Sequence, residues 1–187
     1  MNDKNPMLAR KMRRGIQFGV IPFVMTPDGS IRIVLLTSRG TRRWVIPKGW
    51  PKRRLKPYEA AAEEAFEEAG LSGAIVGKHP IGAYAYSKEI SPSLSIPCAV
   101  KVFLLQVEVQ AETWLEQHER SIQWCDPRTA ATLVAEPELS SLLRTLPALV
   151  QRRRKSLSKR QLSLSGLGQS LREVPILSGE MQVVSDE

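Results

Sequence analysis

Several residue types that build common functional sites are scarce in this 187-residue chain. The two cysteines, Cys98 and Cys125, and the two histidines have neither the spacing of a zinc site nor that of a CxxC redox motif. Aromatic residues make up only 6%, and few of them lie near the basic runs, so they form a weak stacking platform for nucleic acid. These shortages point to carboxylates, lysines and arginines as the reactive side chains.

Long apolar runs are missing as well, because no stretch of 18 apolar residues occurs that could span a membrane. A basic run at 11–14 precedes an apolar segment, as it does in a signal peptide. Gln17 and Pro22 interrupt that segment, however, and no A-x-A cleavage site follows it. We therefore expect a soluble cytoplasmic protein with two free thiols and no membrane partner.

Positive charge is in excess, with 27 Lys and Arg against 19 Asp and Glu, a net charge of +8. Such a balance suits an anionic partner, which includes polyphosphates, nucleic acids and membrane surfaces. Eight of the basic residues are concentrated within 18 positions: Arg39, Arg42, Arg43, Lys48, Lys52, Arg53, Arg54 and Lys56. Their mutual repulsion favours a bound polyanion near this strip.

Hydrophobic patterning predicts strands followed by helices. The β-branched segments 16–25 and 31–38 flank the turn sequence TPDGS and predict a hairpin. Further strands are expected at 44–46, 74–88, 97–109 and 121–125, and helices at 58–69, at 127 to about 134, and from 137 onward with a kink or end at Pro147. This order indicates an α/β (α+β) fold, a mixed sheet with helices packed on its faces.

The chain length suits one domain with a core, flanked by two terminal segments. We assign residues 15–150 to the domain and 1–14 to an N-terminal segment. Residues 151–187 are basic, rich in serine and poor in aromatics, which predicts a loosely ordered tail.

The predicted helix 58–69 carries five glutamates and no lysine or arginine. At about 100° per residue, Glu64, Glu67 and Glu68 fall within one arc of about 100°. Like charges at this spacing destabilise a helix by roughly 0.2–0.5 kcal/mol per pair, unless a cation binds them. A row of carboxylates suits a hard divalent cation such as Mg²⁺, whereas a solvated acidic face is the alternative. The basic loop that precedes the helix favours the metal site, because a phosphate group can bind to basic side chains and to a metal ion at the same time.

The window Gly49–Leu71 resembles the Nudix box, G-x5-E-x7-R-E-U-x-E-E-x-G-U, in which U is a bulky apolar residue. Gly49, Glu64, Glu67, Glu68 and Gly70 match the motif. The resemblance covers about residues 14–150 and implies a Nudix-like α/β/α sandwich. It also implies a hydrolase that cleaves a phosphoanhydride bond in a polyphosphorylated substrate, such as a dinucleoside polyphosphate or a diphosphoinositol polyphosphate.

Two positions depart from the motif. Leu55 stands at the first glutamate, and Glu63 stands at the arginine. In the family these two positions are thought to interact, and the arginine orients a metal-binding glutamate. Because both members of the pair are replaced, we predict a rebuilt support, in which Arg53 or Arg54 holds Glu63 away from the metal.

The resemblance implies roles for individual residues. Mg²⁺, or Mn²⁺, would bind Glu64, Glu67 and Glu68, neutralise charge on the attacked phosphorus and lower the pKa of a bound water. The general base would be Glu67 or Glu68, or a carboxylate outside the box, Glu116 or Glu119. The substrate phosphates would contact a larger set of residues: Arg39, Arg43, Lys48, Gly49, Arg53 and Arg54.

Two other functions fit the same residues. The lost Leu55/Glu63 pair and the basic C-terminal residues favour a catalytically weak Nudix-like domain that binds nucleotides or RNA as a sensor or scaffold. A metal-free nucleic-acid binder is the weakest alternative, because the aromatics are few. The pattern favours a small phosphate-rich molecule as the partner and leaves the oligomeric state open.

Overall fold

The computed structural model describes residues 15–91 and 94–169, with side chains as far as residue 156. The chain divides into two units between Arg154 and Lys155. The first unit holds the sheet and the helices packed on it, and the second holds the continuation of the last helix. The segments 1–14 and 170–187, on which part of the terminal predictions fall, lie outside the described residues.

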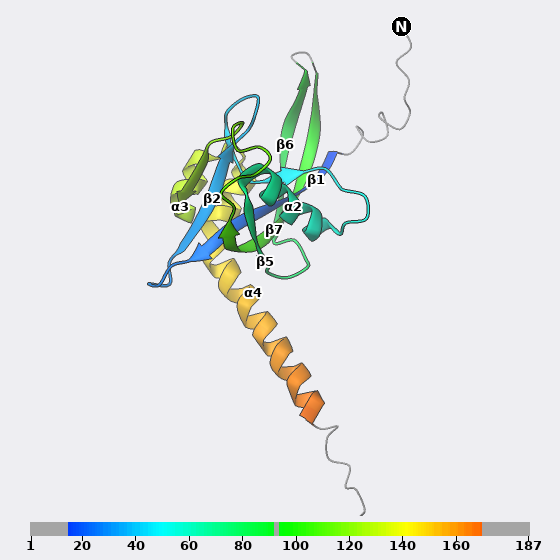
Figure 1. The fold of residues 1–187 in the computed structure, drawn as a ribbon, viewed down its shortest axis with the longest axis vertical. Coiled ribbons are helices and arrows are strands. Elements are labelled where there is room, and N and C mark those ends of the chain that lie inside the picture. Colours follow the sequence, from blue (N-terminus) through cyan, green and yellow to red (C-terminus); the bar gives the residue numbers. More distant parts are fainter. Residues whose placement is uncertain (1–14, 92–93, 170–187) are drawn as a thin grey trace, which may run out of the picture. The chain divides into compact units, whose positions relative to one another are not determined.

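The strands of the first unit form one mixed sheet (Figure 1). They are β1 (Gly15–Met25), β2 (Ile31–Thr37), β3 (Trp44–Val45), β4 (Lys48–Gly49), β5 (Leu71–Ile75), β6 (Gly82–Ser91), β7 (Leu94–Gln110) and β8 (Ile122–Cys125). The main path runs β3-β2-β1-β7-β5, with β4 on β1, β6 on β7 and β8 on β2. Only the β1–β7 pair is parallel, and the other pairs are antiparallel. The predicted mixed sheet and the β1–β2 hairpin are confirmed.

The single long segment predicted at 74–88 is wrong, because the structure divides it into β5 and β6. Gly77 has a φ of +83°, which few other residues adopt, and Pro80 has no amide to donate to a ladder. The break lets the two strands pair with different parts of β7: β5 pairs near its end and β6 along its first part.

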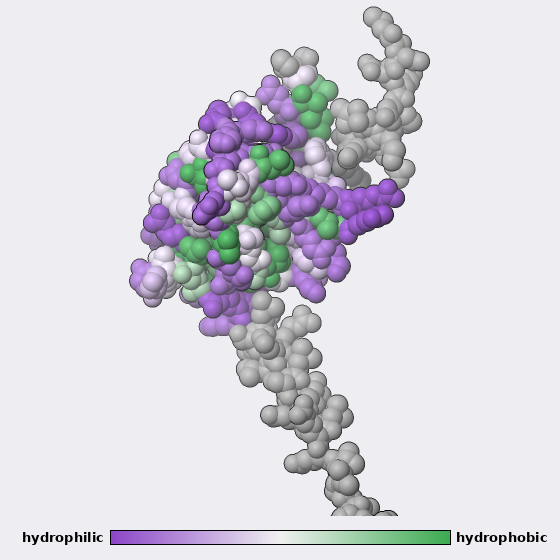
Figure 2. All heavy atoms as spheres, viewed as in Figure 1, coloured by the Kyte–Doolittle hydropathy of each residue, from purple (hydrophilic) through white to green (hydrophobic). Residues whose placement is uncertain are grey.

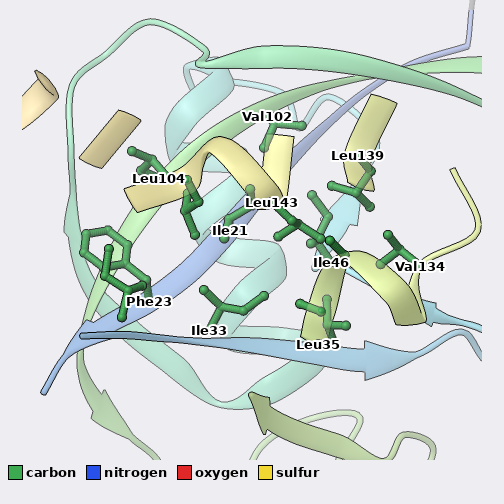
Figure 3. Packing of buried hydrophobic residues seen from close by; sticks show 14 of the residues in the cluster. Ile21, Phe23, Ile33, Leu35, Ile46, Val102, Leu104, Val134, Leu139 and Leu143 are labelled. Carbon is green, nitrogen blue, oxygen red and sulfur yellow. The ribbon is translucent and has the colours of Figure 1, made fainter. Parts of the chain in front are cut away.

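The helices cover both faces of the sheet. Helix α2 (Pro57–Ala69) packs on one face, and α3 (Pro127–Leu133) and the first part of α4 (Pro137–Gln169) pack on the other. Successive side chains of β1 point to opposite faces of the sheet and so contribute to two separate core clusters. Val20 packs in the cluster on the α2 side, whereas Ile21 lies in the cluster with Leu139 and Leu143 of α4 (Figure 3). The predicted α/β/α sandwich is therefore confirmed.

Helix α2 approaches the sheet closely because its inner face carries alanines. Ala61, Ala65 and Ala69 are fully buried in the core, whereas Ala62 is only partly buried. The helix ends at Gly70, whose φ of +68° lets its amide reach the carbonyls of the last turn.

Helix α4 continues past Pro147 to Gln169, so the helix does not end at this proline, which was one of the two predicted outcomes. The proline removes one helical hydrogen bond, but burial of Leu139, Leu143, Leu146 and Val150 against the sheet outweighs that loss. Residues 151–169, predicted to be loosely ordered, are helical. Among the described helices, none combines the length and the apolar character that a membrane span requires.

Replacing Gly70 by alanine should lower the free energy of unfolding by about 1–3 kcal/mol, because a side chain is strained at this φ. An added Cβ would also lie 2.7 Å from the Trp114 ring. Gly29→Ala is the matched control, since Gly29 has a φ of +82° but open space around it. Urea unfolding should show a larger loss for Gly70→Ala; equal losses would show that the Trp114 contact is unimportant.

Candidate active site

The close approach of α2 to the sheet places two glutamates in partly buried surroundings. The side chains of Glu64 and Glu68 are only 13% and 7% exposed. Glu64 lies directly against the backbone of β4, so that a Cβ at Gly49 would overlap its carboxylate. The first glycine of the motif is thus required by the glutamate fifteen residues later, which explains their fixed spacing.

Lys52 joins three glutamates of α2. Its Nζ lies 2.7 Å from Glu67 Oε2, 3.2 Å from Glu64 Oε1 and 3.3 Å from Glu63 Oε2. We call Glu63, Glu64 and Glu67 the carboxylate cluster. One ammonium therefore offsets the mutual repulsion of these carboxylates, which lie three or four residues apart or adjacent on the helix.

Burial and charge act in opposite directions within the carboxylate cluster. Burial raises the pKa of Glu64, and the hydrogen bond from Lys52 offsets part of that rise. Burial also disfavours the ammonium of Lys52, but its hydrogen bonds to Glu67 and Glu64 outweigh this and raise its pKa. Lys52 therefore stays charged at neutral pH and holds the cluster.

Glu68 has other partners than the carboxylate cluster. Its Oε1 accepts a hydrogen bond from Arg120 Nη2, and its Oε2 accepts one from the Lys48 amide at 3.2 Å. Burial raises the pKa of Glu68 to about 7, although the positive charges of Lys48 and Arg120 oppose the rise. Glu68 can thus exchange a proton near neutral pH, as a general base requires.

The loop before β8 supplies the counter-charge for Glu68. Its Glu116 amide donates to the Glu67 carbonyl at 3.1 Å and fixes the loop to the end of α2. Arg120 then reaches Glu68, Glu116 at 2.6 Å and the Thr37 carbonyl at 3.0 Å, with only 6% of its side chain exposed. Arg39 bridges the same loop from outside, with ion pairs to Glu116 and Glu119 at 3.3 and 3.4 Å.

A pocket of about 490 Å³ opens beside Glu68. Four cationic side chains line it: Arg39, Lys48, Lys88 and Arg120. Tyr86 forms part of the wall, and its hydroxyl donates to Gln17 Oε1 at 2.6 Å. The Lys48 Nζ lies 5.6 Å from the Tyr86 ring centre, and burial lowers the pKa of this lysine. Glu68 and Glu89 also line the pocket and offset part of this charge, but arginine and lysine side chains are groups that bind phosphate.

The NUDIX domain family model matches residues 14–146. The chain belongs to the Nudix family. Among curated relatives, Nudix hydrolase 13, mitochondrial, of Arabidopsis thaliana is 28% identical over 121 residues, which are 62% of this chain and 59% of the relative. Nudix hydrolase 17, mitochondrial, of the same plant is 30% identical over 112 residues, which are 57% of this chain and 59% of the relative. The chain thus spans about three fifths of the length of these relatives.

Solved structures show the same fold. A C. elegans Ap4A hydrolase in a binary complex is 25% identical, with a TM-score of 0.56 over 73% of this chain and 98% of that chain. The E. coli dihydroneopterin triphosphate pyrophosphohydrolase is 15% identical, with a TM-score of 0.50 over 70% of this chain and 92% of that chain. The second likeness concerns the fold alone.

The Nudix motif residues are only partly brought together. Glu64 and Glu67 meet on Lys52, whereas Glu68 lies on the pocket side with Arg120. Within the described part of the chain, no three acidic, histidine or cysteine side chains form a ready-made metal site. The donors nevertheless fit a hard cation chemically, since carboxylate oxygens of Glu64 and Glu67 already converge on one positive charge.

The predicted substrate-binding residues occupy different surroundings. Arg39 and Lys48 line the pocket, whereas Arg43 pairs with the buried Glu136 at 3.4 Å. Arg53 and Arg54 are exposed and do not line it. The prediction that one of these two arginines holds Glu63 is wrong, because Lys52 does so. Both arginines lie in the turn after Lys52, and Arg54 has a φ of +73° there.

Sequence reasoning missed Arg120, Lys88 and the role of Lys52. Arg120 had a weak signal, as the one arginine in an acidic loop that leads into a strand. Lys88 follows Tyr86 by two residues on a strand, so the two side chains share a face and line one pocket. Glu116, left open beside Glu119 as an outside carboxylate, is the more buried of the two and contacts Arg120.

Replacing Arg120 by methionine should lower the free energy of unfolding by about 3–5 kcal/mol, because it leaves Glu68 and Glu116 buried without their partner. Arg39→Met removes another ion pair of Glu116, but this arginine is 61% exposed, so the loss should stay below about 1 kcal/mol. Urea unfolding at neutral pH measures both. Similar losses in the two variants would contradict the buried role of Arg120.

Proposed function

We propose that this chain is a metal-dependent hydrolase that cleaves a phosphoanhydride bond of a dinucleoside polyphosphate. The observation that carries the proposal is the position of Glu68, which lies at the end of the Nudix box and lines the cationic pocket. Box carboxylates and phosphate-binding cations are thus within one site. Membership of the Nudix family supports hydrolysis of such a bond.

The cations of the pocket would bind and orient the substrate. Arg120 is held by Glu68 and Glu116, so its guanidinium is preorganised, and Arg39 is held from the other side of the loop. Lys88 lies 5.8 Å from the Trp50 ring centre and extends the positive surface. Fixed cations stabilise charge on a phosphoryl group without reorganisation during the reaction.

Glu64 and Glu67, whose carboxylates converge on one positive charge, would hold a divalent cation. When bound, Mg²⁺ or Mn²⁺ would neutralise phosphate charge and make water more acidic. Glu68 is the favoured proton acceptor, because burial sets its pKa at about 7, near the operating pH. Glu116 and Glu119, which both pair with Arg39, remain the alternative candidates outside the box.

The substrate class follows from the amount of positive charge. Beyond the pocket, the loop between β4 and α2 carries Lys52, Arg53, Arg54 and Lys56, and it is a hydrophilic projection in Figure 2. A sugar nucleotide with two phosphates would use little of this surface, whereas a chain of four phosphates could extend along it. The similar C. elegans structure is of an Ap4A hydrolase, which supports the same class.

One observation favours a second function. Lys52 occupies the carboxylate cluster and could keep a metal away, which suits a domain that binds nucleotides without turnover. Incubation of the full chain with Ap4A and Mg²⁺ separates the two. Release of nucleotide products supports the hydrolase, whereas binding without products supports a sensor or scaffold.

Glu67→Gln and Glu68→Gln should each cut Ap4A turnover by at least ~10²-fold, because each loses a carboxylate that holds the metal or accepts a proton. Glu59→Gln is the control on the same helix, since Glu59 accepts from the Lys56 amide and glutamine can replace it in a capping box. Steady-state kinetics with Mg²⁺ gives the comparison. Near-normal turnover in both variants would refute the assignment.

The KM for Ap4A should rise steeply with ionic strength, because the Debye length falls from about 10 Å at 0.1 M to about 3 Å at 1 M salt. Lys88→Glu should raise KM more than it lowers kcat, since Lys88 lines the pocket and pairs with no carboxylate among the residues that the structure describes. Charge reversal at Arg53 and Arg54 tests whether the exposed strip adds to binding. A KM independent of salt, or a preference for sugar nucleotides, would exclude a polyphosphate substrate.

A further inference from the structure

The carboxylates that would hold a metal are held here by a side chain of the chain itself. Lys52 Nζ lies within 3.3 Å of all three members of the carboxylate cluster, and its side chain is only 26% exposed. A lysine ammonium has three donors, and three carboxylates lie within reach of it. Its contacts thus extend well beyond one loose surface ion pair.

A divalent cation needs the same atoms. Mg²⁺ takes carboxylate oxygens at about 2.0–2.1 Å, and the Lys52 ammonium already contacts oxygens of Glu64 and Glu67. Two cations among these oxygens would lie close together and repel each other strongly in a partly buried site. The ammonium and the metal are therefore alternative occupants.

We propose that Lys52 is an internal competitor for the metal, so that binding of a divalent cation to Glu64 and Glu67 expels its ammonium from the carboxylate cluster. This inference rests on the metal-binding part of the proposed function. Lys52 is a positioning residue, because it acts on the carboxylates and its position is not one of those that the Nudix motif specifies.

The two positions that differ from the Nudix motif, Leu55 and Glu63, explain why a lysine can compete with the metal. The motif puts an acid in the loop and a base on the helix, whereas here the loop supplies Lys52 and the helix supplies Glu63. An acid in the loop would be repelled by the glutamates, but a lysine is attracted to them. An expelled ammonium would remain part of the basic loop before α2.

The test is a titration of the full chain with Mn²⁺ in the absence of substrate, with free Mn²⁺ followed by electron paramagnetic resonance. Lys52→Met should bind Mn²⁺ at least about fivefold more tightly than the natural chain, the lower end of typical coupling between two ligands. Lys52→Arg keeps the positive charge and should restore weaker binding.

Lys56→Met is the matched control, because Lys56 lies in the same loop but pairs with Glu59 and is 67% exposed. Its Mn²⁺ affinity should equal that of the natural chain. Equal or weaker Mn²⁺ binding by Lys52→Met would overturn the proposal, and weaker binding would mean that Lys52 instead aligns the carboxylates for the metal.

A second measurement uses the natural chain and does not depend on how a variant folds. Acetylation of lysines by an activated ester, followed by mass spectrometry, should modify Lys52 several-fold faster when Mg²⁺ is saturating, because the ammonium has left its hydrogen bonds. Lys56 should react at the same rate with and without Mg²⁺. An unchanged Lys52 rate would contradict expulsion.

The outcomes separate this inference from the proposed function. Tighter Mn²⁺ binding by Lys52→Met without hydrolysis of Ap4A supports the competition and refutes the hydrolase. Hydrolysis of Ap4A without any effect of Lys52 on Mn²⁺ affinity refutes the competition alone. Absence of Mn²⁺ binding in every form refutes both.

Discussion

The arrangement of this protein depends on the close packing of α2 against the sheet. Ala61, Ala65 and Ala69 are small enough for the helix to approach the strands, and the glycine of β4 admits the Glu64 side chain at the same contact. The approach places carboxylates of the helix in a region where water solvates them poorly. An unpaired buried carboxylate is costly, so each of them needs a partner.

The partners come from two loops and divide the site into two halves. Lys52, from the loop before α2, offsets part of the negative charge of the carboxylate cluster. Arg120, from the loop before β8, neutralises Glu68 and faces the pocket. A backbone hydrogen bond from Glu116 to the Glu67 carbonyl also links the second loop to α2, next to the first half of the site.

Local sequence patterns predicted much of the fold and identified the Nudix motif. The hairpin, α2 and its end at Gly70 follow from turn residues, alanines and a glycine adjacent in sequence. The cationic partners of the glutamates could not be predicted from the sequence. Four cations lie between 52 and 56, and the turn geometry at Arg54 decides which of them points back. Arg120 lies 52 residues from Glu68, so only the folded chain brings them together.

Relative to the Nudix motif, this chain has a base in the loop before α2 and an acid on the helix, which changes the partners of the glutamates. In the motif, the acid and the base of the supporting pair contribute zero net charge, and Lys52 with Glu63 contributes zero as well. The difference lies in position, since the positive charge now sits on the loop and can reach Glu64 and Glu67 in addition to Glu63. The ammonium of Lys52 thus stabilises the carboxylate cluster. The proposed competition follows from this geometry, because a cation that binds Glu64 and Glu67 would need the oxygens that Lys52 contacts.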